Sequence, residues 1–157
     1  MFDKVVLSCQ SEVFKNMIKN KTLIEKQAGV MEMNPMEILE NDIDSDSMEQ
    51  LLFYIYQGKV TESKMLNTDL LMAADKFMVN GLLDLCVKYL KSNLSLENVL
   101  DVLVKAELTN QKALFDSASR FVRTNTGCLK KTSAYNEMFE KDPKFIARVL
   151  SKMLDVE

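Results

Sequence analysis

The sequence of 157 residues contains no histidine. Histidine is the side chain that most often changes charge near neutral pH, so its absence excludes Ser-His-Asp and Cys-His arrangements and histidine-bearing metal sites. An enzyme built from this chain would depend on carboxylates, lysines or a lone thiol. No pattern in the sequence brings such groups together, so we predict no catalytic residue, no metal and no cofactor.

Cysteine is scarce as well, and Cys9, Cys86 and Cys128 are far apart with no CxxC pair. This spacing favours neither a disulfide framework nor a zinc cluster, and it is typical of a reducing compartment. The N-terminal apolar run is too short for a signal peptide, and no stretch approaches the roughly 20 apolar residues that span a bilayer. We therefore expect an intracellular protein of the nucleus or cytoplasm, without a membrane partner.

The chain has only 4 glycines and 2 prolines, with 47% hydrophobic and 27% charged residues. This composition is typical of a compact, mainly helical protein, and the length suits one domain or a small domain with an appendage. Twenty basic and 23 acidic residues give a net charge of −3. Because phosphate-backbone binding depends on a positive field, nucleic acid is not an expected partner.

Three apolar stripes at helical spacing dominate the middle of the chain and predict helices that share a core. Gly58 lies just past the first stripe, where a left-handed C-terminal position suits glycine, and Gly81 is interpreted as the break between the second and third. The stripes comprise Met48, Leu51, Leu52 and Ile55; then Leu71, Ala74, Phe77 and Met78; then Leu82, Leu85, Cys86, Tyr89 and Leu90.

Weaker patterns lie on the N-terminal side of these stripes. The apolar run 5–7 fits a strand end or the entry to a helix, and a helix is predicted over 11–19 with Ser8 or Ser11 as its cap. The pattern lapses from 19 to 35, and a short strand is predicted at about 36–40. Polar residues over 41–46 are placed to cap the helix that follows.

A module boundary is predicted near Asn93. Ser95 is placed to cap a new helix. A turn at Thr109–Asn110 precedes a further helix, which carries Leu114, Ala118, Phe121 and Val122 on one side. We expect a break at 125–127, a short turn over 133–139, and a last helix that begins with Pro143 in its first position.

Several segments resemble the speckle-type POZ group of BTB/POZ proteins, in that family's order and spacing. They read DKVVLSCQSEVFKNM, FYIYQGKV, LLMAADKF, LKSNLSLENVLDVL and KTSAYNEMF. The resemblance implies an α+β, mainly helical BTB/POZ fold over 1–92, with helices packed on a small sheet. It also implies a short helical extension over 93–157 that is similar to the start of a BACK domain.

The same resemblance implies a protein-interaction module that binds cullin-3 and forms homo- or heterodimers, as adaptors of ubiquitin ligases do. Leu23 and Glu25 are the nearest match to the family's cullin-contacting motif, one residue later than expected. Leu96, Leu100 and Leu103 fall in a second cullin-contacting segment, although their spacing equally fits core packing.

The chain also departs from the family pattern. Asp3 stands where the family has a histidine. We expect the family's first strand and hairpin to be missing, and no substrate-binding MATH domain to precede the BTB part. We therefore expect an adaptor-type component or a modulator of full-length relatives. The alternative is an oligomerisation module of a transcriptional or scaffold complex that does not bind cullin.

Overall fold

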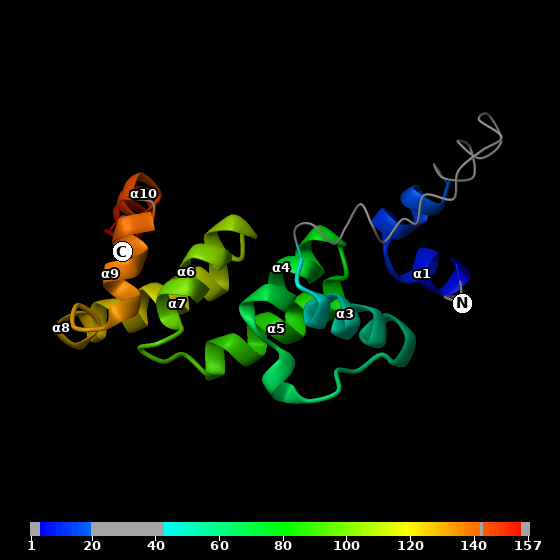
Figure 1. Ribbon diagram of the computed structural model, residues 1–157, viewed down its shortest axis with the longest axis horizontal. Helices are drawn as coiled ribbons and strands as arrows, with labels where there is room; N and C mark the ends of the chain where they lie inside the picture. Colours follow the sequence, from blue (N-terminus) through cyan, green and yellow to red (C-terminus); the bar gives the residue numbers. More distant parts are fainter. Residues whose placement is uncertain (1–3, 20–42, 142, 155–157) are drawn as a thin grey trace. The chain divides into compact units, whose positions relative to one another are not determined.

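The computed structural model describes residues 4–19, 43–141 and 143–154, which form helices joined by short connections (Figure 1). The chain divides into two compact units, Met1–Cys86 and Val87–Glu157. The helices are α1 (Lys4–Gln10), α3 (Ser45–Gln57), α4 (Thr68–Lys76), α5 (Asn80–Ser92), α6 (Val99–Leu108), α7 (Lys112–Thr124), α8 (Thr126–Leu129), α9 (Ser133–Lys141) and α10 (Pro143–Leu154), with a 3₁₀ turn η1 (Ser63–Met65). Residues 12–19 are also helical.

The mainly helical class is confirmed, whereas the small sheet is not seen. No strand occurs in the described ranges, and the strand predicted at 36–40 lies outside them. The apolar run 5–7 was interpreted either as a strand end or as the entry to a helix. It belongs to α1, so the helix is confirmed. The domain boundary predicted at 92/93 stays a prediction.

Local chemistry sets both ends of α3, as the sequence indicates. The Asp44 carboxylate accepts a hydrogen bond from the backbone N–H of Ser47 at 2.9 Å, which satisfies one of the free donors of the first turn. At the other end Gly58 has φ +70° and donates its N–H to the carbonyl of Tyr54 at 2.7 Å. Glycine reaches this left-handed conformation without the steric penalty of a Cβ atom.

The core of the first unit is built from the predicted stripes. Leu51 of α3, Leu71 of α4 and the neighbouring Phe77 are all fully buried. Phe14, from the helical residues 12–19, stacks on Phe77 with ring centroids 4.7 Å apart and an interplanar angle of 9°. The N-terminal helical segment is thus attached to the core of the unit by an aromatic pair.

The connection from α4 to α5 differs from the prediction in two respects. The break lies at 77–79, while Gly81 lies within α5. Met78 does not join the core: it has φ +54° and is 55% exposed, because α4 ends before the helical spacing reaches it. Gly81 has a long-range role, since a Cβ atom there would lie 2.5 Å from the hydroxyl oxygen of Tyr54.

In the second unit α6 packs against α7, and α9 and α10 pack against α6. The predicted turn after α6 is confirmed, with Asn110 at φ +56°. The predicted break at 125–127 is confirmed at Asn125, which ends α7, but not at 126–127: the carbonyl of Asn125 accepts hydrogen bonds from the N–H groups of Cys128 and Leu129 at 3.1 and 3.0 Å, and α8 begins at Thr126. Residues 133–141 form a helix rather than a short turn, and Pro143 begins α10 as predicted.

Candidate docking surfaces

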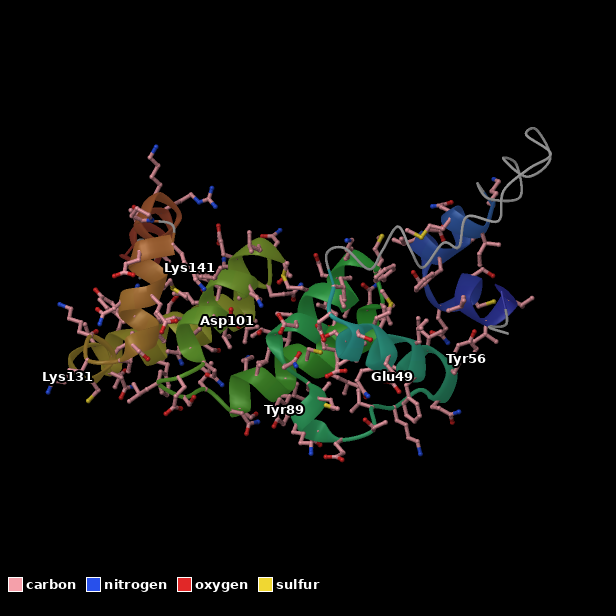
Figure 2. All side chains as sticks on the ribbon, viewed as in Figure 1. Glu49, Tyr56, Tyr89, Asp101, Lys131 and Lys141 are labelled. Atoms are coloured by element: carbon pink, nitrogen blue, oxygen red, sulfur yellow. The ribbon has the colours of Figure 1, made fainter. Side chains whose placement is uncertain are left out.

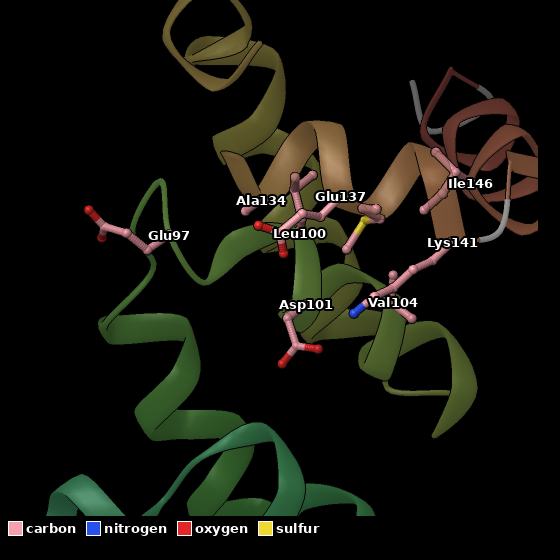
Figure 3. Close-up of a pocket in the computed structure, with 9 residues that line it drawn as sticks. Glu97, Leu100, Asp101, Val104, Ala134, Glu137, Lys141 and Ile146 are labelled. Carbon is pink, nitrogen blue, oxygen red and sulfur yellow. The ribbon is translucent and has the colours of Figure 1, made fainter. Parts of the chain in front are cut away.

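A pocket of about 330 Å³ lies within the second unit, between α6, α9 and α10 (Figure 3). Apolar side chains of all three helices contribute to it, and charged side chains stand among them. The residues that line it are Glu97, Leu100, Asp101, Val104, Ala134, Glu137, Met138, Lys141 and Ile146. The arrangement is that of a small apolar site with a charged rim.

The rim carries three carboxylates and one ammonium group. Glu97, Glu137 and Lys141 are exposed to solvent, and Asp101 forms an ion pair with Lys105 at 3.5 Å. Figure 2 labels Asp101 on α6 and Lys141 on α9. Exposed ion pairs contribute little to stability, but a surplus of one sign selects among partners. The pocket therefore favours an apolar side chain with a cationic neighbour over an anionic ligand.

The structure brings three of the predicted contact residues together at the start of α6. Leu96 is half-buried in the turn before the helix, Leu100 lines the pocket and is 6% exposed, and Leu103 is buried in the core at 2%. Leu23 and Glu25 lie outside the described residues. The contact of all five with cullin-3 stays a prediction.

A pair of reciprocal hydrogen bonds fixes the turn that holds Leu96. The Ser95 backbone N–H donates to the side-chain oxygen of Asn98 at 2.8 Å, and the Ser95 hydroxyl accepts from the Asn98 N–H at 3.3 Å. This is the geometry of a capping box, in which two side chains satisfy each other's free backbone donors. The prediction that Ser95 caps the helix is wrong for α6 itself, which begins at Val99 with Asn98 at its N-cap; Ser95 caps the turn over 96–98 instead.

The remaining reactive groups of the described residues do not converge on a reaction centre. No group of three cysteine, aspartate or glutamate side chains is placed to hold a metal ion in the ranges that the structure covers. Cys86 is buried as predicted, and burial raises the pKa of its thiol to about 12, whereas Cys9 and Cys128 are exposed. No helix among the described residues is long and apolar enough to cross a membrane.

Sequence reasoning missed the charged rim of the pocket. Glu137 and Lys141 lie on α9, about 40 positions beyond Glu97. Periodicity reports the faces of single helices and not which faces meet, so no local signal indicates this site.

Helices that present apolar and charged surfaces, without converging catalytic groups in the described part, are typical of a protein-interaction module. The pattern of the BTB/POZ domain matches residues 1–94. The chain therefore belongs to the BTB/POZ domain family, whose members mediate contacts between proteins.

Curated relatives extend over most of the chain. The mouse TD and POZ domain-containing protein 5 is 32% identical over 145 residues, which cover 91% of this chain and 40% of that protein. A BTB/POZ domain-containing protein of Arabidopsis thaliana is 28% identical over 151 residues, 96% of this chain and 59% of that protein. The protein maternal effect lethal 26 of Caenorhabditis elegans is 26% identical over 151 residues, 96% of this chain and 36% of that protein.

The chain thus spans between 36% and 59% of the length of these three relatives. Their names agree with the BTB/POZ assignment. They do not single out the speckle-type POZ group.

Proposed function

We propose that this chain is a substrate-adaptor-type component or a modulator of a cullin-3 RING ubiquitin ligase. The observation that carries the proposal is the set of speckle-type POZ segments, which continue from FYIYQGKV through LKSNLSLENVLDVL into KTSAYNEMF and so extend past the BTB/POZ match at residue 94. In the family that these segments resemble, the extension adds to the cullin-binding surface. The proposal places the protein in the nucleus or cytoplasm, which suits its unpaired Cys9 and Cys128.

Two contact regions follow from the proposal. Leu23 would occupy an apolar pocket of cullin-3, with Glu25 orienting the contact through polar bonds. In the second unit Leu96 has accessible surface for a direct contact, while Leu100 would be reached through the pocket beside α6. Leu103 is too deeply buried for a substitution to report on binding alone, because truncating a core leucine costs about 2–5 kcal/mol of stability.

A binding assay with the purified cullin-3 N-terminal region tests the proposal. The wild-type chain should form a complex, and the double substitution Leu23→Asp and Glu25→Ala should weaken it by tenfold or more, at roughly the magnitude of a hot-spot loss. Lys131→Ala, at an exposed position near α8, serves as the matched control and should bind as the wild type does. Absence of a complex, or a complex that the double substitution leaves unchanged, would refute the proposal.

The alternative function is self-association without cullin, and one feature favours it. Val5 on α1 is 68% exposed, more than the other large apolar side chains exposed among the described residues. An exposed apolar side chain on a helix face gains free energy when a second copy or a related BTB domain covers it.

Light scattering coupled to size exclusion separates the two functions. A dimer that Val5→Asp dissociates, together with no cullin-3 complex, supports the alternative. A cullin-3 complex that persists in the Val5→Asp variant supports the adaptor function instead.

A further inference from the structure

The pocket between α6, α9 and α10 has the size and lining to hold an apolar side chain. Leu100 of α6 and Ile146 of α10 are each 6% exposed. The other apolar lining residues, Val104, Ala134 and Met138, are half-buried. The volume of about 330 Å³ lies at the lower end of the roughly 300–1,000 Å³ of small-molecule sites, so it suits one anchoring side chain better than a whole cofactor. The flexible thioether of Met138 adapts to the shape of such an anchor.

The charges on the rim of this pocket are not balanced by partners in the part of the chain that the structure describes. Asp101 pairs with Lys105 at 3.5 Å. Glu97 and Glu137, in contrast, are exposed and form no ion pair with another described residue. Lys141 supplies the positive charge among the described lining residues, and it is exposed as well. The rim thus keeps a surplus of negative charge, which a cationic group of a partner would offset.

The charged groups stand around the apolar lining. Glu137 and Lys141 lie four positions apart on α9 and so share one face of that helix, while Glu97 lies in the turn before α6 (Figure 3). Their side chains line the same pocket as Leu100 and Ile146. An apolar side chain that enters this pocket therefore brings its sequence neighbours within reach of the carboxylates.

We propose that this pocket binds a peptide segment of a partner protein in which an apolar anchor side chain lies next to lysine or arginine. The anchor occupies the space lined by Leu100, Met138 and Ile146, and its basic neighbour pairs with Glu137 or Glu97. An acidic neighbour would meet like charge on the rim, so acidic segments are selected against. The inference goes beyond the proposed function, because the chemistry of the segment defines the ligand and its test does not involve cullin-3.

Three peptides with blocked ends probe this preference. The first reads Ser-Arg-Leu-Leu-Arg-Ser, and in the other two both arginines are replaced by glutamine or by glutamate. Two-dimensional amide NMR spectra of the full chain, titrated with each peptide, report the affinity and the place of binding. The arginine peptide should shift amides of α6, α9 and α10 and bind roughly tenfold more tightly than the glutamine peptide, since two exposed ion pairs contribute about threefold each. Added salt should reduce this difference, and the glutamate peptide should bind most weakly.

Substitutions on the rim should change the affinity for the arginine peptide in opposite directions. Glu97→Gln and Glu137→Gln should each weaken it by roughly threefold, because one ion pair is lost. Lys141→Gln should strengthen it by roughly twofold, because a like charge is removed. A general loss of stability would not produce effects of opposite sign on one rim.

Two further variants separate the pocket from the charge of its helix. Ala134→Leu fills the pocket from α9 and should abolish the amide shifts, while a thermal melt checks that the variant folds. Glu140→Gln removes the same charge as Glu137→Gln from an exposed position of α9 that does not line the pocket. This matched control should bind the arginine peptide as the wild type does.

The outcomes of these titrations leave the cullin-3 assay unaffected, so the inference and the proposed function fail separately. Equal binding of the three peptides, tighter binding of the glutamate peptide, or no shift at the amides of the pocket overturns the inference. Binding that Glu97→Gln and Glu137→Gln leave unchanged, or that persists in a folded Ala134→Leu variant, also overturns it. A preference for the arginine peptide, with opposite effects of Glu137→Gln and Lys141→Gln and a silent Glu140→Gln, supports it.

Discussion

Removal of the Phe14 ring should release the N-terminal helical segment from the first unit. The ring is 5% exposed and stacks on the fully buried Phe77. Truncation of a buried phenylalanine to alanine costs about 3–5 kcal/mol, of which the aromatic pair contributes about 0.5–1.5 kcal/mol. Since 1.4 kcal/mol corresponds to a factor of ten, the lower limit is a change of about 100-fold in the opening equilibrium of the segment.

Amide hydrogen exchange, followed by mass spectrometry, measures this opening directly. In Phe14→Ala, peptides from residues 4–19 should lose about 100-fold of their protection, while those from α3 change less. Phe14→Leu keeps most of the buried volume and should cost only about 1 kcal/mol, or a factor of about five. Asn16→Ala, at an exposed position of the helical residues 12–19, is the control for nonspecific loss of helix. A loss of protection below threefold in Phe14→Ala would show that the stack does not attach the segment.

Three further predictions concern local features. Asp44→Ala should lower the free energy of unfolding in urea by about 1 kcal/mol. Because the pKa of Asp44 in the folded protein is lowered from 3.8, this loss of stability should be complete above pH 4 and should disappear as the pH falls through the folded pKa. Gly58→Ala should cost about 1 kcal/mol by thermal melting, since an alanine at φ +70° is strained. Native protein should react with a thiol reagent at Cys9 and Cys128 but at Cys86 only after unfolding, as counted by mass.

The Asp44 prediction depends on the net effect of opposing influences. Burial raises the pKa of this carboxyl, but hydrogen bonds from Ser47 and the neighbouring backbone outweigh burial and leave it lowered. A carboxyl with a lowered folded pKa stabilises the protein where it is ionised and loses that contribution in acid. A urea series that showed no dependence on pH between 3 and 6 at this site would contradict the assignment of Asp44 as the cap, within roughly the error of such extrapolations.

Features set by neighbouring residues could be predicted from the sequence. The cap at Asp44, the stop at Gly58 and the first-position Pro143 each depend on residues within one helical turn, and all three hold in the structure. The apolar stripes likewise report which face of each helix is buried. Local propensity and tertiary packing agree in these elements, as they do in most of a natural fold.

Features that join distant segments could not be predicted in this way. The pocket combines side chains of α6, α9 and α10, and which helix faces meet is a property of tertiary packing. Gly81 was interpreted as a helix break because glycine is flexible, but its lack of a Cβ atom accommodates Tyr54, 27 positions away. The predicted break at Gly81 is therefore wrong, and the feature that needs glycine at this position is its contact with Tyr54, which the local sequence does not indicate.

Two assignments near helix ends differ from the structure for different reasons. Residues 126–129 form α8 directly after the turn at Asn125, because the carbonyl of Asn125 accepts two backbone hydrogen bonds, so the predicted break is confined to Asn125. Met78 was placed in the core because it follows Leu71 by seven residues, but α4 ends at Lys76 and the spacing no longer applies. Met78 instead takes the left-handed position that ends α4, where the N–H of Val79 donates to the carbonyl of Ala74 at 2.9 Å. Asn110 ends α6 in the same way, with the N–H of Gln111 donating to the carbonyl of Ala106 at 2.8 Å, so hydrogen bonds at a helix end decide both positions and apolar periodicity does not report them.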